Sequence, residues 1–250
     1  MSQYEQDVLL ELARWQKEMK QRPSFFNKLS KGMQTRVNKI IPEKVHQVFT
    51  TAIKQMVRGV LAGSGFINPK PLHDLKFLAR EMAAREKIKV YRNTATAEGA
   101  ITGAGGFLLG LADFPLWLTV KIKMLFEIAA VYGYDVNDFK ERLYILHIFQ
   151  LTFSSQKGRQ QTYAIMEGWD EYSATLPTTM QEFDWRNFQQ EYRDYIDLAK
   201  LLQLVPGIGA VVGAYVNHKL TEKLGEFAMM AYRMRVMNAP LKKLQSKGQP

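Results

Sequence analysis

Asp113 is the acidic residue whose sequence neighbours most favour chemistry, because apolar residues flank it on both sides. A partly buried carboxylate has a shifted pKa, and it can act on a substrate when a histidine or an amide lies close to it in space. The partners that we consider are His147, Asn217 and His218, in an enzyme that acts on a lipid or a small amphipathic molecule. The structural alternative, which we favour, is that Asp113 caps the following helix by accepting backbone N–H bonds.

Other catalytic and metal-binding patterns are missing from the sequence. The chain contains no cysteine, which excludes thiol nucleophiles, disulfides and cysteine-ligated metals. Its four histidines form neither an H-E-x-x-H motif nor a pair four residues apart. The run from Gly207 to Gly213 resembles a dinucleotide-binding fingerprint, but its third glycine comes one residue late and no strand precedes it. We therefore expect no metal and no cofactor, and we favour a protein that is not an enzyme.

Two apolar segments, residues 100–112 and 201–216, are unusually rich in glycine. A glycine inside a helix costs about 1 kcal/mol relative to alanine, so a close approach between helices must offset this cost. We expect the two segments to be helical and to pack together, either in a closed core or against lipid. Each is shorter than the ~20 apolar residues that span a bilayer, so we expect no classical membrane span. The glycines expected at this contact are Gly103, Gly105, Gly106, Gly110, Gly207, Gly209 and Gly213.

The positive charge of the chain is concentrated near the N-terminus. Lysines and arginines outnumber acids by 34 to 24, and between residues 22 and 58 eight basic residues accompany a single acid. We expect a basic face that contacts an anionic phospholipid membrane, where each basic residue contributes about 1 kcal/mol. Its residues are Lys28, Lys31, Arg36 and Lys39. We expect no binding to nucleic acid, because the sequence shows no zinc-finger ligands, RNP-type strands or helix-turn-helix.

Hydrophobic periodicity predicts helices nearly throughout and no strands, so we expect an all-α fold, a single-domain bundle of several helices. Ser2 and Glu5 form the capping-box pattern of a first helix. Pro42 fits the first turn of a helix that ends near Ala62. Gly133 fits the C-cap of a later helix.

Apolar residues at helical spacing predict the faces that point inward. Pro71 fits the first turn of a helix with the inward residues Leu72, Leu75, Leu78 and Met82. Asp135 fits the N-cap of the helix that carries Phe139, Leu143 and Leu146. A last long helix has the apolar stripe Leu220, Leu224, Phe227, Ala231 and Met234. We expect one domain over residues 1–238, followed by a mobile basic tail at 239–250.

Two stretches of the chain carry a family resemblance. The first is Gly99–Asp135, GAITGAGGFLLGLADFPLWLTVKIKMLFEIAAVYGYD, and the second is Val205–Arg235, VPGIGAVVGAYVNHKLTEKLGEFAMMAYRMR. Both resemble the EcsC family. The resemblance implies a helical, cytoplasmic protein that associates with an ABC transporter and has no established reaction. With the charge pattern, it leads us to expect a non-catalytic accessory protein at the inner face of the membrane.

Overall fold

The computed structural model describes residues 2–21, 43–63, 68–104, 113–179 and 181–184, four single positions from 188 to 196, and residues 210–247. Side chains are described in these ranges except at 43–46, 95–104, 210–213 and 238–247. The helices of the described residues are α1 (Gln3–Lys20), α3 (Glu43–Ala62), α4 (Phe77–Ala104), α6 (Phe114–Val131), α7 (Phe139–Phe153), α8 (Gln156–Glu167), α9 (Trp169–Thr175) and α12 (Ala210–Lys247). Within these ranges the only β-type pairing is an isolated bridge between Ser154 and Ile196. The all-α, single-domain prediction is confirmed.

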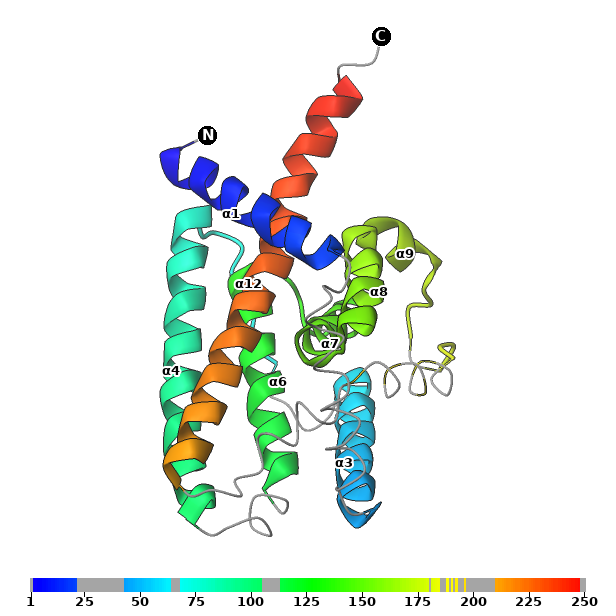
Figure 1. Cartoon of the computed structure of the whole chain (residues 1–250). Coiled ribbons are helices and arrows are strands. Elements are labelled where there is room, and N and C mark those ends of the chain that lie inside the picture. The colour runs from blue at the N-terminus through cyan, green and yellow to red at the C-terminus, as the bar shows by residue number, and fades with distance from the viewer. Residues whose placement is uncertain are drawn as a thin grey trace.

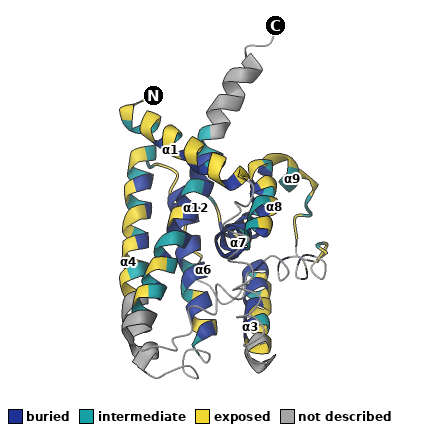
Figure 2. Ribbon diagram, in the orientation of Figure 1, coloured by how far each residue is buried: buried dark blue, intermediate teal, exposed yellow. Residues whose placement is uncertain are grey.

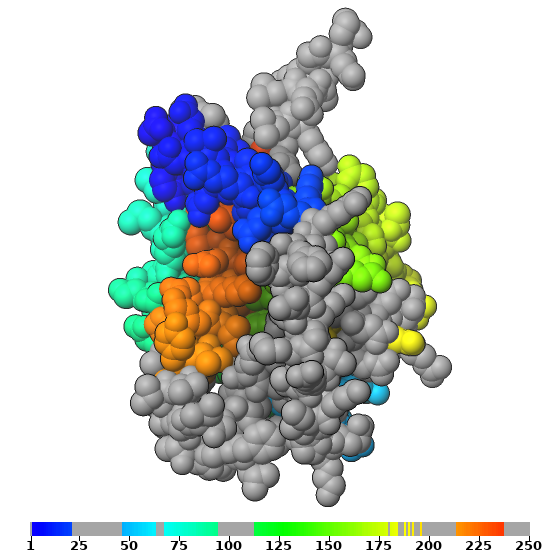
Figure 3. Space-filling view, viewed as in Figure 1, coloured from blue at the N-terminus to red at the C-terminus, as the bar shows by residue number. Residues whose placement is uncertain are grey.

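Helices α4, α6 and α12 run side by side and form the long axis of the molecule (Figure 1). Helix α4 is antiparallel to α12, and their contact is the most extensive between any two described helices. Helix α1 crosses α12 and α4 near one end, as the space-filling view shows from the front (Figure 3). Helices α8 and α9 lie beside the end of α1, and α3 packs against α6 and α7 toward the other end of the molecule.

The core is centred on α6 and α7, which are buried on nearly every side (Figure 2). In α7, 13 of the 15 residues are buried, and they include polar side chains as well as apolar ones. The predicted apolar stripe of the last helix is confirmed in α12, where Leu224, Phe227, Ala231 and Met234 are buried and Leu220 is partly buried. Across the described part of the chain, no helix combines the length and the apolar character that crossing a bilayer requires.

Local signals placed several helix ends correctly. At the start of α1, Ser2 Oγ accepts from the Glu5 amide at 3.3 Å, and the Ser2 amide donates to Glu5 Oε2 at 2.7 Å. This is the predicted capping box. At the end of α6, Tyr132 is the C-cap and Gly133 has a φ of 89°. Glycine adopts this left-handed conformation without steric cost, so Gly133 ends the helix as predicted, one position after the C-cap.

The prediction that Asp135 caps α7 is wrong. The N-cap is Asp138, whose Oδ1 accepts from the Lys140 amide at 2.9 Å. Asp135 Oδ1 instead accepts from the Asn137 amide at 2.9 Å, which closes an Asx turn before the helix. Aspartate stabilises both arrangements, so sequence alone does not separate them.

The predicted inward face of α4 is also wrong. The helix begins at Phe77 rather than near Pro71, and three residues of the predicted stripe, Leu72, Leu78 and Met82, are exposed. The described residues of α4 that are buried are Glu81, Ala84 and Ile88, and Phe77, Ala83 and Tyr91 are partly buried against the core. The partner helix sets this face, because α12 supplies a cation to Glu81 and bare backbone at Gly225 to Ile88.

Helix α12 extends beyond the predicted end of the domain. Its backbone stays helical through Ala239 and as far as Lys247. The mobility of the basic segment 239–250 stays a prediction.

Candidate functional site

Four helices meet at one end of the molecule, where α3, α6 and α12 begin and α4 ends (Figure 1). We call this the α6 end, and it comprises the first two turns of the helices that begin at Glu43, Phe114 and Ala210 and the last turn of the helix that ends at Ala104. Packed aromatic rings join two of these helices, since the ring centres of Phe49 in α3 and Phe114 in α6 are 4.0 Å apart. The starts of α3 and α6 therefore lie directly against each other.

A buried hydrogen bond joins α6 to α12 at the same end. Trp117 Nε1 donates to Asn217 Oδ1 at 2.7 Å, and both side chains are buried. The Trp117 ring also stacks on Phe114, with ring centres 5.8 Å apart. The ammonium of the fully buried Lys121 lies 5.2 Å from the centre of the same Trp117 ring. Trp117 thus fixes the start of α6 relative to the part of α12 around Asn217.

The register of α4 against α12 brings the two glycine-rich segments to the α6 end. Glu81 bonds to Arg233, and Arg92 bonds to Glu222. The two helices are antiparallel, so moving eleven residues along α4, from Glu81 to Arg92, corresponds to moving eleven residues back along α12, from Arg233 to Glu222. Continuing this register places the last residue of α4 level with the first residue of α12. Gly103 belongs to that last turn of α4. The glycine-rich segments therefore join the described helices at the same level.

Large apolar side chains are exposed at the α6 end. Leu116 in the first turn of α6 is 58% exposed, and Tyr215 near the start of α12 is 62% exposed. Val48 in α3 is also exposed. Single exposed apolar residues are common on protein surfaces. Leu116 lies in the first turn of α6, and Val48 and Tyr215 lie in the second turns of α3 and α12, the other helices that begin at this end.

A second set of polar residues lies in the interior, between α1, α4, α6 and α12. Arg233 Nη2 donates to Glu81 Oε2 at 2.5 Å, and the hydroxyls of Tyr132 and Tyr4 also donate to the Glu81 carboxylate. Arg233 donates to Glu11 Oε2 at 2.8 Å as well. Burial raises the pKa of Glu81, but the hydrogen bonds from Arg233, Tyr132 and Tyr4 outweigh it and hold that pKa below its usual value.

A neighbouring ion pair joins α7 to α12. Arg235 Nη1 donates to Glu141 Oε2 at 2.6 Å, and the Tyr232 hydroxyl donates to Glu141 Oε1 at 2.6 Å. The Arg235 guanidinium also lies over the rings of Tyr134 and Tyr144, 3.8 and 4.4 Å from their centres. Burial raises the pKa of Glu141, although Arg235 and Tyr232 oppose that rise. These contacts are stabilising interactions within the core, and no sequence motif indicated them.

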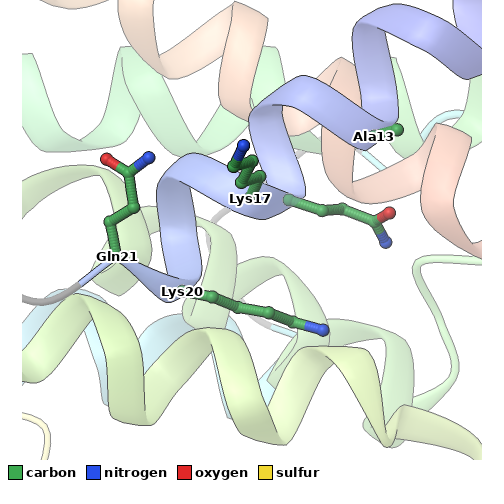
Figure 4. A pocket seen from close by; sticks show the side chains of 5 residues that line it. Ala13, Lys17, Lys20 and Gln21 are labelled. Carbon is green, nitrogen blue, oxygen red and sulfur yellow. The ribbon is translucent and has the colours of Figure 1, made fainter.

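Two cavities are lined by described residues. One, of about 240 Å³, lies between α1, α4 and α12. Its apolar lining is Trp15, Phe227, Met229 and Met230, and its charged lining is Glu11, Arg85, Glu226 and Arg233. The other, of about 480 Å³, follows the last turns of α1, where Lys17, Lys20 and Gln21 lie along one stretch of the helix (Figure 4). Neither cavity is lined by Asp113.

A model of the EcsC protein family matches residues 6–237. The chain belongs to the EcsC protein family. The protein named Protein EcsC from Bacillus subtilis (strain 168) is 43% identical over 231 residues, which cover 92% of this chain and 95% of that protein. Uncharacterized protein YdbA from the same organism is 28% identical over 257 residues, which cover 95% of this chain and 94% of that protein. No solved structure matches the chain.

In this EcsC-family chain, Asp113 does not act as the predicted cap. It occupies the N-cap position of α6, but its side chain accepts no capping hydrogen bond. Its backbone is helical, with φ −84° and ψ −7°, whereas an N-cap side chain reaches the first amides from an extended backbone. The first turn of α6 therefore has no side-chain cap from Asp113.

His147 lies in an aromatic environment of its own. It is buried against the rings of Trp169, Tyr172 and Phe188, with ring centres 5.8 to 6.1 Å away. Its Nδ1 is 3.1 Å from Gln150 Oε1, and its Nε2 has no hydrogen-bond partner among the described residues. Burial lowers the pKa of His147 to about 4. The ring is therefore neutral at physiological pH.

The four residues predicted as a catalytic group do not form one in the described contacts. Asn217 binds Trp117, and His218 follows it on α12, where it is partly buried. None of the hydrogen bonds or ring contacts of His147 reaches Asp113, Asn217 or His218. Across the described ranges, no group of three His, Asp or Glu side chains is placed to hold a metal ion. An enzyme built around Asp113 gains no support from this arrangement.

Most of the residues predicted to contact lipid lie outside the described residues. These are Lys28, Lys31, Arg36, Lys39, Gly105, Gly106, Gly110, Gly207 and Gly209. Gly103 and Gly213 are described as part of the helical backbone of α4 and α12. The packing of the glycines against one another and the basic face stay predictions of the EcsC-family sequence.

Proposed function

We propose that this EcsC-family chain is a non-catalytic peripheral membrane protein, and that its α6 end binds anionic phospholipid. The observation that carries the proposal is the exposure of Leu116 and Tyr215 at the end where the three lipid-seeking segments of the sequence join the described helices. The basic segment leads into α3 at residue 43. The glycine-rich segments follow α4 at residue 104 and precede α12 at residue 210.

Helix polarity favours an anionic surface at this end. Helices α3, α6 and α12 direct their N-termini toward it, and only α4 directs its C-terminus there. Because a helix N-terminus carries a partial positive charge, three of them attract anionic headgroups. The first turn of α6 also has no side-chain cap from Asp113. Apolar insertion and electrostatic attraction would then act on the same face.

The cellular role that we propose is that of an accessory to an ABC transporter at the cytoplasmic face of the membrane. Its support is the family resemblance, together with the lipid-binding end described above. A helper of this kind needs no active site.

Vesicle flotation tests the proposal. The full chain is mixed with vesicles of phosphatidylcholine alone or with one third phosphatidylglycerol, and bound protein is measured after centrifugation. We expect flotation only with the anionic vesicles, and less of it as salt is raised, since counterions screen charge. Replacing Lys28, Lys31, Arg36 and Lys39 by glutamine should reduce flotation several-fold. Equal flotation with both lipids would reject the proposal.

A matched pair of variants tests which end binds. Leu116→Asp with Tyr215→Asp places two charges at the α6 end, and we expect flotation to be lost. Leu78→Asp with Met82→Asp makes the same chemical change at the far end of α4, where the two side chains are 49% and 65% exposed. This control should float as the wild type does. Loss of flotation in the control alone would place the lipid contact elsewhere.

A further inference from the structure

Three buried hydrogen-bond donors at the junction of α1, α8 and α12 have no acceptor among the described residues. They are Trp15 Nε1, Arg159 Nε and Thr162 Oγ1. Trp15 is 8% exposed, and Thr162 is fully buried. A buried donor without an acceptor costs about 1–3 kcal/mol. Three of them therefore carry a large unfavourable energy for one domain.

Ring contacts link the side chains of two of these donors, and helical spacing links the third to them. The Trp15 ring centre is 5.7 Å from that of Tyr163 in α8 and 5.8 Å from that of Phe227 in α12. The Arg159 guanidinium carbon is 5.8 Å from the same Phe227 centre. Thr162 is three residues after Arg159 in α8, and side chains at this spacing are neighbours, with Cβ atoms about 5–6 Å apart. Trp15 and Arg159 therefore both adjoin the Phe227 ring, and Thr162 is next to Arg159 on α8.

Lys223 is a second cation at this junction, besides Arg159. Lys223 Nζ in α12 is 5.6 Å from the centre of the Phe227 ring that Arg159 also contacts. Among the described residues neither cation forms an ion pair. Burial lowers the pKa of both, and repulsion by Arg159 lowers that of Lys223 further. Glu18 at the end of α1 attracts both cations, and Glu226 attracts Lys223, without pairing with either.

We propose that this junction binds an oxyanion, a phosphate or carboxylate group, between Arg159 and Lys223. The two cations supply the charge, and the Thr162 hydroxyl and the Trp15 indole N–H donate further hydrogen bonds. An oxyanion offers several acceptor lone pairs and reduces the repulsion between the cations. A water molecule would satisfy the donors but leave that repulsion in place.

The ligand that fits best is a phosphate ester with an apolar group attached. Trp15 and Phe227, which adjoin the cations, also line the 240 Å³ cavity, whose wall continues with Met229 and Met230. A phosphate at the cations would place an attached apolar chain beside this wall. The junction lies under α1, away from the α6 end, so the inference does not depend on the proposed membrane contact (Figures 1 and 3).

Titration calorimetry on the full chain tests the site with two probes that distinguish the source of the phosphate. One is inorganic phosphate, and the other is dihexanoyl phosphatidic acid below its critical micelle concentration, which removes any membrane surface. We expect the wild type to bind. Tighter binding of the second probe would assign the site to lipid headgroups, and equal binding would assign it to free phosphate. Failure of both probes to bind would overturn the proposal.

Variants show whether the junction is responsible. Arg159→Gln and Lys223→Gln should each weaken binding at least tenfold. Lys157→Gln removes the same charge from an exposed position of α8 and should leave binding unchanged. Equal weakening in all three variants would mean that only general charge attracts the anion, which would overturn the site.

The variant Thr162→Val separates a loss of binding from a loss of the fold. It replaces an unsatisfied buried hydroxyl by a methyl group of similar size, so the unliganded protein should become more stable in thermal unfolding. Its affinity for the bound probe should still fall several-fold. A stabilised variant with unchanged affinity would show that the anion binds away from Thr162, which would overturn the site.

Discussion

The Arg233 guanidinium forms a forked ion pair with the Glu81 carboxylate inside the α4–α12 interface. Nε donates to Oε1 at 3.0 Å and Nη2 donates to Oε2 at 2.5 Å, and both side chains are buried. This pair fixes both the face that α4 presents and the register along α12. The register in turn sets which segments meet at the α6 end.

Removing one partner of this pair should be strongly destabilising. In Glu81→Leu the buried Arg233 keeps only Glu11, so we expect the free energy of unfolding to fall by about 3–5 kcal/mol. The measurement is urea denaturation followed by circular dichroism. Adding Arg233→Met removes the unpaired charge and should restore at least ~2 kcal/mol of the loss. Losses that simply add in the double variant would contradict the pairing.

Gly225 should tolerate no larger residue while Ile88 is present. A Cβ built at Gly225 would lie 2.5 Å from Ile88 Cγ1 and 2.8 Å from Cγ2, atoms too close to the Ile88 backbone to move aside. Gly225→Ala should therefore lower the unfolding free energy by about 1–3 kcal/mol through overpacking. Alanine at both positions should recover part of that loss, because the space of the isoleucine is freed. A neutral Gly225→Ala single variant would show that α4 and α12 are farther apart than described.

Proton binding by His147 in the unfolded chain should lower the stability of the protein in mild acid. Its pKa is about 4 when folded and 6.5 for the free side chain, so the unfolded chain binds the proton first as pH falls. The free energy of unfolding should then decrease from pH 6.5 down to pH 4, by about 3 kcal/mol at 1.4 kcal/mol per pKa unit. His147→Phe should remove this part of the pH dependence in urea denaturation at a series of pH values. An identical pH profile for the variant would contradict the assignment.

Helix ends and faces with local causes were accessible from the sequence. Ser2 and Glu5 lie within one turn, and Gly133 follows the last residue of a helix, so neither signal depends on a distant partner. The stripe of α12 was accessible because apolar residues alone define it. The cap of α7 was not, because Asp135 and Asp138 both suit a turn and a helix start.

The features that the sequence did not predict depend on contacts between segments that are far apart in the chain. Glu81 and Arg233 are 152 residues apart, so no spacing rule links them. The available signal was an arginine next to the apolar stripe of the last helix, which implies a buried partner without identifying it. The prediction of the inward face of α4 failed for the same reason, since Leu78 and Met82 are more apolar than Glu81 but are exposed.

Site-specific fluorescence is the most direct test of the lipid-binding end. The chain has no cysteine, so single cysteines at Leu116, Tyr215, Leu78 and Met82 can each carry a polarity-sensitive label without further changes. On addition of phosphatidylglycerol vesicles, we predict a blue shift and increased emission for labels at Leu116 and Tyr215, and no change at Leu78 and Met82. A shift at the latter pair, with none at the former, would contradict the account.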